Sequence, residues 1–169
     1  AMLRYQEGSA STMRREQGFL DALKDYSGIE VVSANQYGGP TTETAYRASE
    51  NLLAPHKDAS GNLTVEGIFC PNESTTFGML RALQDGGLAG KVKFIGFDTS
   101  AKLEAALRQG HLNGLILQNP RRMGYLAVKT IADHLRGQQV PKRIDTGATL
   151  VTPDNADKPE IKALLTPEF

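Results

Sequence analysis

The sequence is poor in the residues and patterns that several classes of protein require. A single cysteine, Cys70, excludes a disulfide within the chain and leaves the redox compartment open. Tryptophan is absent. No apolar run approaches the roughly 18 residues needed to span a bilayer. The first residues lack the basic-then-apolar layout of a secretory signal. These absences indicate an ordinary globular domain.

Charge of one sign is lacking as well. The 19 Lys and Arg residues balance 19 Asp and Glu residues, so the formal net charge is zero at pH 7. The basic residues are scattered, and pairs such as Arg14–Arg15 are too short to form a basic patch. Without a net positive field, neither nucleic acid nor anionic lipid is an expected partner.

The arrangements that usually carry catalysis or metal binding are missing too. His56, His111 and His134 lie far apart in the sequence and show no metal-ligand spacing. No glycine-rich phosphate loop follows the first predicted strand. An aspartyl nucleophile at Asp98, as in haloacid dehalogenase-like phosphatases, would need a second Asp where Ser100 stands. We therefore expect no catalytic residue, no metal site and no cofactor, and predict that the protein is not an enzyme.

Short apolar runs alternate along the chain with longer segments of helical period. Strands are predicted at residues 2–5, 29–33, 65–70, 92–97, 115–117 and 146–151, and helices at 11–25, 42–53, 74–85, 101–109, 122–136 and 159–165. This alternation predicts an α/β fold of three layers, with a mostly parallel sheet and helices on both faces. The length fits a single domain over residues 1–169.

Polar residues recur where successive predicted strands end. Asn72, Asp98 and Gln118 each follow a strand, and Arg15 lies in the first turn of the helix after the first strand. In open parallel sheets, ligands bind outside the carboxyl ends of the strands. Arginine is unfavourable near a helix N-terminus, which favours another role for Arg15. The pattern places four candidate ligand-binding residues at one edge of the sheet.

Each of the four also has a purely structural interpretation. Asp98 and Asn72 could cap a turn or a helix, and Gln118 could close a turn. Arg15 could pair with an acidic neighbour on the surface. Taken together, however, a guanidinium, a carboxylate and two amides form the group of side chains that reads vicinal hydroxyls, because Arg and Asp donate and accept in pairs.

The order of these motifs resembles the carboxy-terminal half of type I periplasmic sugar-binding proteins, the ribose-binding-protein-like receptors of ABC transporters. The stretches that carry the resemblance are Arg15-Glu16-Gln17-Gly18-Phe19, Gly67-Ile68-Phe69-Cys70-Pro71-Asn72-Glu73, Leu80-Arg81-Ala82-Leu83, Phe94-Ile95-Gly96-Phe97-Asp98, Gln118-Asn119-Pro120 and Leu150-Val151-Thr152-Pro153-Asp154-Asn155. They cover nearly the whole chain in the right order. The fold this resemblance implies is one lobe of the periplasmic binding protein-like I architecture.

In this family the ligand sits between two α/β lobes that close over it. By resemblance, four residues of the present lobe would hydrogen-bond the hydroxyls of a monosaccharide: Arg15, Asn72, Asp98 and Gln118. Tyr37 and Glu73 are weaker candidates near the same rim. The function implied is that of the solute-binding component of an ABC-type sugar transporter, with the transporter permease as its partner.

The resemblance also implies a departure in length, because family members are about twice as long and include an amino-terminal lobe. The usual stacking aromatics and the export signal would belong to that part, so a periplasmic location is expected with the signal peptide outside this chain. Residues 119–143 would belong to the first lobe. The helix predicted at 122–136 then has an apolar face with less to cover it, which predicts a homodimer or a repacked helix.

A second hypothesis is the effector-binding core of a LacI-type transcription repressor, which shares the fold and much of the motif order. An export signal or a helix-turn-helix ahead of residue 1 in the gene would separate the two. The ending at residues 150–155 and the absence of basic patches favour the transport receptor. Either function leaves this lobe with only half of a ligand site.

Overall fold

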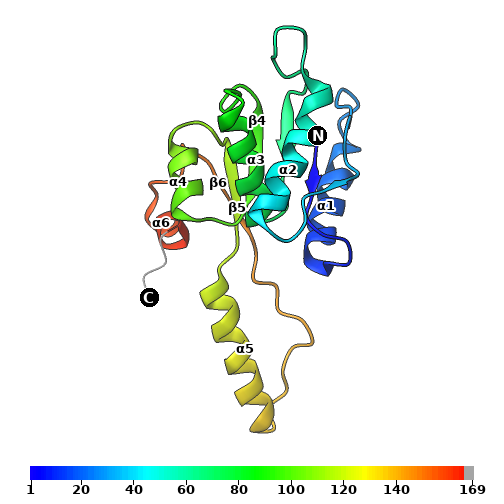
Figure 1. The fold of residues 1–169 in the computed structure, drawn as a ribbon. Helices are drawn as coiled ribbons and strands as arrows, with labels where there is room; N and C mark the ends of the chain where they lie inside the picture. The colour runs from blue at the N-terminus through cyan, green and yellow to red at the C-terminus, as the bar shows by residue number, and fades with distance from the viewer. Residues whose placement is uncertain (166–169) are drawn as a thin grey trace.

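The predicted alternation of strands and helices is present in a computed structural model, which describes residues 1–165. In chain order the elements are β1 (Leu3–Arg4), α1 (Ala10–Leu23), β2 (Gln36–Tyr37), α2 (Thr42–Leu53), a short 3-10 helix η1 (Ala54–His56), β3 (Gly67–Phe69), α3 (Glu73–Asp85), β4 (Lys93–Phe97), α4 (Ala101–Arg108), β5 (Gly114–Leu117), α5 (Pro120–Leu135), β6 (Thr149–Val151) and α6 (Pro159–Leu165). Figure 1 shows an α/β body from which α5 and the chain that follows it project as an arm.

The sheet is mostly parallel, as predicted. Four strands lie in the order β3-β4-β5-β6, and only β6 runs antiparallel to its neighbour. Strands β1 and β2 form a separate parallel pair. A parallel bridge between Met2 and Phe69 joins this pair to the edge of β3. The carboxyl ends of β1, β3, β4 and β5 therefore lie along one edge of a continuous surface.

Helices cover both faces of this sheet. On one face, the Phe19 ring of α1 stacks on Phe69 of β3 with ring centroids 4.8 Å apart. On the other face, α3 packs so closely on β4 that the hydroxyl of Thr76 accepts a hydrogen bond from the backbone of Phe97, at 3.0 Å. Helix α4 lies beside α3, with the ammonium of Lys102 5.2 Å from the ring centre of Phe77. The three-layer prediction is confirmed.

The core lies between the sheet and the α2–α4 layer and is almost entirely aliphatic. Its largest fully buried side chains are Met2, Leu3, Leu52, Met79, Leu80, Leu83, Phe94, Leu103, Leu107, Leu112, Leu115 and Leu117. Burial of this apolar surface is the main driving force for folding. Because nearly every strand and helix of the body contributes to one cluster, the strand ends that follow are held in fixed positions.

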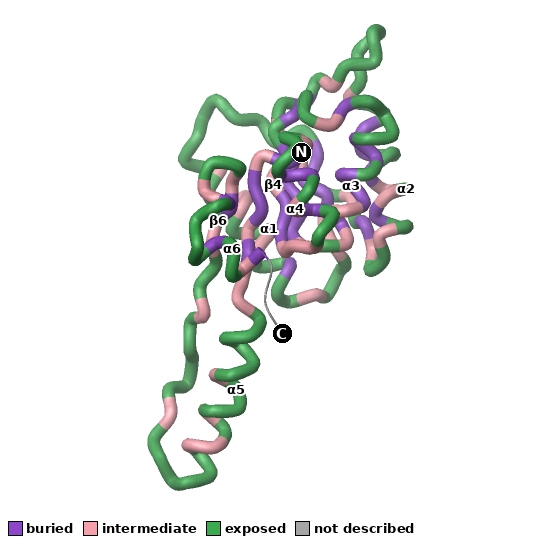
Figure 2. Tube along the Cα trace, turned by 90° about the vertical axis from the view of Figure 1, so that its left-hand side faces the viewer, coloured by how far each residue is buried: buried purple, intermediate pink, exposed green. Residues whose placement is uncertain are grey.

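The arm is far less buried than the body. Helix α5 is amphipathic, yet none of its residues is buried. Figure 2 colours most of it exposed along its whole length. Val128, Ile131 and Leu135 are 70%, 60% and 79% exposed. None of the helices in residues 1–165 is long and apolar enough to cross a membrane.

The strand predicted at residues 29–33 is wrong. The end of this segment lies beside β1, where the backbone N–H of Met2 donates to the carbonyl of Ser33 at 2.8 Å, but the strand next to β1 is Gln36–Tyr37. Ile29 and Val32 are 53% and 46% exposed. The apolar pattern favoured a strand, but a strand also requires a paired neighbour, and residues 29–32 have none in the described chain.

Gly96 is the tightest packing position in the sheet, and it generates the first prediction. A Cβ at this position would overlap the side chain of Thr76 and approach Leu115 Cδ2 to 3.1 Å. We expect Gly96→Ala to lower the free energy of unfolding by about 2–3 kcal/mol, because overpacking forces α3 away from β4. Urea denaturation followed by circular dichroism measures the loss.

The matched control is Gly18→Ala in α1. A Cβ there meets no atom within 4 Å, and alanine is favoured over glycine in a helix by about 0.5–1 kcal/mol. This variant should therefore be slightly more stable than the parent chain. An equal effect of both substitutions would contradict the packing argument at Gly96.

Candidate ligand-binding site

Arg15 is the centre of the cluster of polar residues at the strand ends. Its guanidinium donates to the carbonyl of Pro71 and to Oε1 of Gln118, both at 2.8 Å. The nearest oxygen of Asp98 lies 3.9 Å away. One side chain from α1 thus joins the segments that follow β3, β4 and β5, so the prediction that these positions share one rim agrees with the geometry.

The ring of Phe97 packs against the Arg15 guanidinium and fixes its plane. The Arg15 Cζ atom lies 3.7 Å from the centre of the Phe97 ring. An arginine stacked flat on an aromatic face keeps its N–H donors in the plane, pointing sideways. Burial lowers the pKa of Arg15, while the charge of Asp98 raises it. The side chain remains 19% exposed, so its protein partners do not enclose it completely.

Asp98 has an unusual backbone conformation that orients its side chain. Its φ is +65°, in the left-handed region that a non-glycine residue rarely adopts. Its N–H donates to the carbonyl of Ile116 at 3.0 Å, which continues the β4–β5 pairing one residue beyond the strand. One carboxylate oxygen accepts a hydrogen bond from the Glu73 N–H at 3.3 Å. Residues held this way cluster at functional sites.

Both carboxylates of the rim have pKa values raised above their ordinary values. Burial raises the pKa of Asp98, opposed by the charge of Arg15 and by the hydrogen bond from Glu73. Burial also raises the pKa of Glu73, and the charge of Asp98 adds to that effect. An ionised Asp98 is therefore incompletely compensated, and further hydrogen-bond donors at the rim would stabilise its charge.

Asn72 takes a structural role at the start of α3. Its side-chain oxygen accepts from the backbone N–H and the hydroxyl of Thr75, at 3.4 and 2.6 Å. Its amide nitrogen donates to the Ser74 hydroxyl at 3.0 Å. The helix-cap interpretation of Asn72 thus describes this geometry, although the residue still lies between Pro71 and Glu73, which contact Arg15 and Asp98.

Tyr37 lies apart from the other candidates. Its hydroxyl accepts a hydrogen bond from Arg4 at 3.3 Å, and its ring lies 5.6 Å from the Arg4 guanidinium carbon. Arg4 in turn lies 3.7 Å from Glu16. Tyr37 is 42% exposed, so it is free to present its ring to a ligand, but no contact joins it to Arg15 or Asp98 among the described residues.

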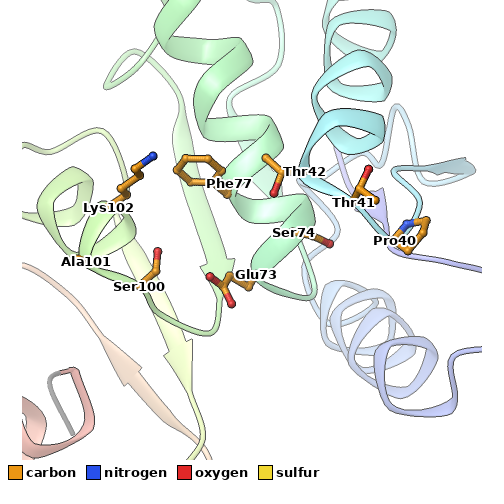
Figure 3. A pocket seen from close by; sticks show the side chains of 9 residues that line it. All are labelled: Pro40, Thr41, Thr42, Glu73, Ser74, Phe77, Ser100, Ala101 and Lys102. Atoms are coloured by element: carbon orange, nitrogen blue, oxygen red, sulfur yellow. The ribbon is translucent and has the colours of Figure 1, made fainter. Parts of the chain in front are cut away.

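Two clefts meet at Glu73 and Ser100. The larger, of about 1260 Å³, includes Asp98 and Gln118 and extends along α4 and α6. The smaller, of about 640 Å³, lies where the first turns of α2, α3 and α4 approach one another. Figure 3 shows its lining, with Ser74 and Glu73 on α3 and Ser100 and Lys102 at the start of α4. Asp98 and Gln118 thus lie in an open cleft that also has apolar lining, including Leu117 and Leu164.

Two residues of the site were not expected from the sequence. Phe97 precedes Asp98 and was interpreted only as a buried strand residue, although its odd position in β4 places it on the α1 face under Arg15. Thr99 has a buried hydroxyl that finds no partner among the described residues. It lines the larger cleft with Asp98. An unsatisfied buried hydroxyl beside a rim carboxylate is a further polar group that a ligand could satisfy.

This arrangement suits the capture of a neutral, polyhydroxylated molecule. A carboxylate can accept from two hydroxyls, and the open edge of the guanidinium can donate to the same pair. In the described chain no group of three or more His, Cys, Asp or Glu residues is placed to hold a metal ion.

Comparison with known families decides the identity of the fold. A family described as periplasmic binding protein domain matches residues 1–139. The chain belongs to this family. Among curated relatives, it is similar to the ribose import binding protein RbsB of Escherichia coli, with 29% identity over 144 residues. That match covers 85% of this chain and 46% of the relative.

Solved structures of family members agree with this assignment. An ABC-type sugar transport periplasmic component from Hahella chejuensis is 40% identical and superposes with a TM-score of 0.80, covering 89% of this chain and 52% of that one. An ABC transporter solute-binding protein from Agrobacterium vitis with bound D-fucose is 35% identical, with a TM-score of 0.88 over 98% of this chain and 55% of that one. The chain spans about half the length of these relatives.

The raised pKa of Asp98 generates the second prediction. Its folded pKa lies above the value of the unfolded chain, so ionisation of Asp98 costs stability at neutral pH and costs nothing below the unfolded pKa. We expect Asp98→Asn to stabilise the ligand-free chain slightly at pH 7, because Asn carries no charge and tolerates a positive φ. The gain is small because the Asp98 side chain is 38% exposed and solvent screens its charge. Thermal unfolding at several pH values measures the effect.

The gain of this variant should shrink as the pH falls through the pKa of Asp98, because the parent residue is then also neutral. Asp154→Asn is the control, since Asp154 is exposed on the surface after β6. It should leave stability unchanged. A gain at Asp98 that persisted unchanged into acid would show that the charge is not its cause.

Proposed function

We propose that this chain is the sugar-contacting lobe of a solute-binding protein of an ABC-type transporter. The observation that carries the proposal is the separation between Arg15 and Asp98. At 3.9 Å the two groups attract each other but do not share a hydrogen bond. Both groups therefore keep unused hydrogen-bonding capacity at the rim. Two neighbouring hydroxyls of a ligand could accept from Arg15 and donate to Asp98.

The known relatives support the ligand class. The curated relative from E. coli is named for ribose import, and the A. vitis structure holds D-fucose. A monosaccharide with adjacent hydroxyls is the shared chemistry of these two. The relatives named here are transport binding proteins, which favours the receptor over the LacI-type repressor core. By the same likeness we propose a periplasmic location and a transporter permease as the partner.

The proposed mechanism is non-covalent. Arg15 donates to sugar oxygens while Asp98 accepts from sugar hydroxyls, and Gln118 and Thr99 offer further polar contacts on the side of β5 and α4. Tyr37 and Asn72 remain proposed contacts at the edge of this rim. A single lobe covers only one side of a sugar, so we expect weak binding, because polar groups that stay half-solvated gain little from exchanging water for ligand.

The third prediction tests this binding directly. D-Ribose and D-fucose should shift the backbone amide resonances of residues around Asp98 and Gln118, with dissociation constants on the order of millimolar. Arg15→Lys should weaken the binding about tenfold or more, because lysine loses the planar fork that contacts two oxygens at once. Nuclear magnetic resonance titration of the isotope-labelled chain measures both.

Asp154→Asn serves again as the control, and it should bind like the parent chain. Shifts confined to surface residues far from β4 and β5, or equal binding by the Arg15→Lys variant, would contradict the proposed site. Because each ligand is titrated separately, the same data rank the sugars by affinity.

We also propose that the α5 arm associates with a second copy of the chain. Tyr125, Val128 and Leu135 follow one another at spacings of three and seven residues, which sets them along one face of the helix. All three are more than 60% exposed. A helix with such a stripe packs well against a copy of itself, because side chains at these spacings interdigitate. Residues 119–143 would then form a unit distinct from the body.

The fourth prediction concerns this association. Sedimentation velocity should show a concentration-dependent dimer, and Val128→Lys should shift it to monomer, because a charge in a helix–helix interface costs several kcal/mol to bury. Ser27→Lys adds the same charge on the exposed surface of the body and should leave the dimer intact. A parent chain that stays monomeric at every concentration would overturn the proposal.

A further inference from the structure

Glu16 of α1 is a charged side chain that the body buries almost completely, since it is only 2% exposed. Its Oε1 accepts a hydrogen bond from the backbone N–H of Tyr5 at 3.1 Å. Its Oε2 is also buried and has no hydrogen-bond partner among residues 1–165. A buried carboxylate needs a compensating charge. The cation beside it is Arg4, whose Nη1 lies 3.7 Å from Oε2.

The guanidinium of Arg4 connects this buried charge to the carboxyl ends of β1 and β2. Its Nε donates to the carbonyl of Ala34 at 2.7 Å, and its Nη1 donates to the phenol oxygen of Tyr37 at 3.3 Å. The same Nη1 is the atom that lies next to Glu16. Arginine can serve these groups together because its donors form a planar fork. Tyr37 is thus held by a guanidinium that a buried carboxylate keeps in place.

This contact decides which hydrogen-bonding capacity the Tyr37 hydroxyl retains. A phenol has one hydrogen to donate and an oxygen that accepts. The oxygen accepts from Arg4, whereas the hydrogen is donated to no group in the part of the chain that the structure describes. A hydrogen bond from a cation polarises the hydroxyl and strengthens it as a donor. Tyr37 is 42% exposed, so this donor is accessible from outside the body.

The backbone after Tyr37 places the residue next to the rim. Gly38 donates to the carbonyl of Arg4 at 2.7 Å. A Cβ on Gly38 would lie 2.9 Å from Cγ2 of Thr75, so the chain here touches the first turn of α3. Thr75 is the residue whose N–H and hydroxyl donate to the side chain of Asn72. Tyr37 therefore lies beside the connection from β3 to α3, which is part of the candidate site.

Helix α1 joins this tyrosine to the other half of the rim. Glu16 lies beside Arg4, and the residue before it, Arg15, donates to Gln118. Adjacent residues of a helix point about 100° apart, so the two side chains reach different strands from the same turn. Glu16 serves the side of β1 and β2, and Arg15 serves the side of β3 to β5. The two halves of the rim thus share one rigid support.

We propose that Tyr37 is a specificity-determining residue of the sugar site, which donates its phenolic hydrogen to an oxygen of the ligand. Arg4 and Glu16 are positioning residues, because they hold the phenol oxygen and leave its hydrogen for the ligand. This inference rests on the sugar-binding function proposed above and adds to it the role of one hydroxyl. It requires a hydrogen-bond acceptor on the ligand at this end of the rim, such as a ring oxygen or a hydroxyl oxygen.

Tyr37→Phe tests this role, because it removes the hydroxyl and keeps the ring. D-Ribose and D-fucose are titrated separately into the isotope-labelled chain and followed by nuclear magnetic resonance. The variant should bind about fivefold more weakly than the parent chain, because one hydrogen bond to the ligand is lost. Tyr26→Phe is the matched control. Tyr26 is 60% exposed and follows the opposite end of α1, so this variant should bind like the parent chain.

Arg4→Lys separates positioning from a general structural role. Lysine keeps a positive charge beside Glu16 but cannot donate to Ala34 and Tyr37 in the geometry of a planar fork. The substitution should weaken binding about threefold in the parent chain. It should have no further effect in the Tyr37→Phe chain, because Arg4 acts on the ligand through that hydroxyl. A general loss of structure would instead weaken binding in both chains.

The outcomes distinguish this inference from the function on which it rests. Equal affinities of the parent chain and Tyr37→Phe, with binding still weakened by Arg15→Lys, would overturn the role of Tyr37 and support the sugar site. Independent effects of Arg4→Lys and Tyr37→Phe would overturn the positioning role. If neither sugar binds to the parent chain, the proposed function fails and this inference fails with it.

Discussion

The guanidinium of Arg15 is the contact on which the rim depends. It draws the carbonyl of Pro71 and the amide of Gln118 to within hydrogen-bond distance and lies flat on Phe97. These partners belong to three consecutive β–α connections, so one side chain sets the spacing of three loops. A partly buried charge of this kind costs desolvation energy, and it is retained here with its donors only partly used. A partly buried arginine with unused donors is expected where a ligand supplies the remaining hydrogen-bond acceptors.

On the opposite face of the sheet, α3 holds the same loops in place. The Thr76 hydroxyl donates to the carbonyl of Asn72 at 2.7 Å and accepts from the N–H of Phe97 at 3.0 Å. It bridges the end of β4 to the first turn of α3, and only a glycine at position 96 leaves room for it. Asp98 follows directly in its left-handed conformation. The rim is therefore fixed from both layers, which is how a binding site on loops becomes rigid enough to orient hydroxyls.

Much of this could be predicted from the sequence, for definable reasons. Strand ends are marked by apolar runs, and the topological rule for parallel sheets brings their polar residues to one edge. This rule was sufficient to predict that Arg15, Asp98 and Gln118 lie close together. It could not reveal that Phe97 lies beneath Arg15, because alternation along a strand shows which residues share a face but not which helix covers that face. Nor could it decide between capping and ligand contact for Asn72, whose side chain can satisfy either role.

The failure at residues 29–33 has a different cause from these ambiguities. The local sequence pattern indicates whether a segment is suited to form a strand. A strand also needs a neighbouring strand that supplies its hydrogen bonds. Val31 and Val32 meet the first condition and not the second. The same holds for α5, whose apolar stripe has helical spacing but no partner in the body. Both segments have the predicted period and are nevertheless exposed in the structure, because burial depends on a partner surface that the local sequence pattern does not specify.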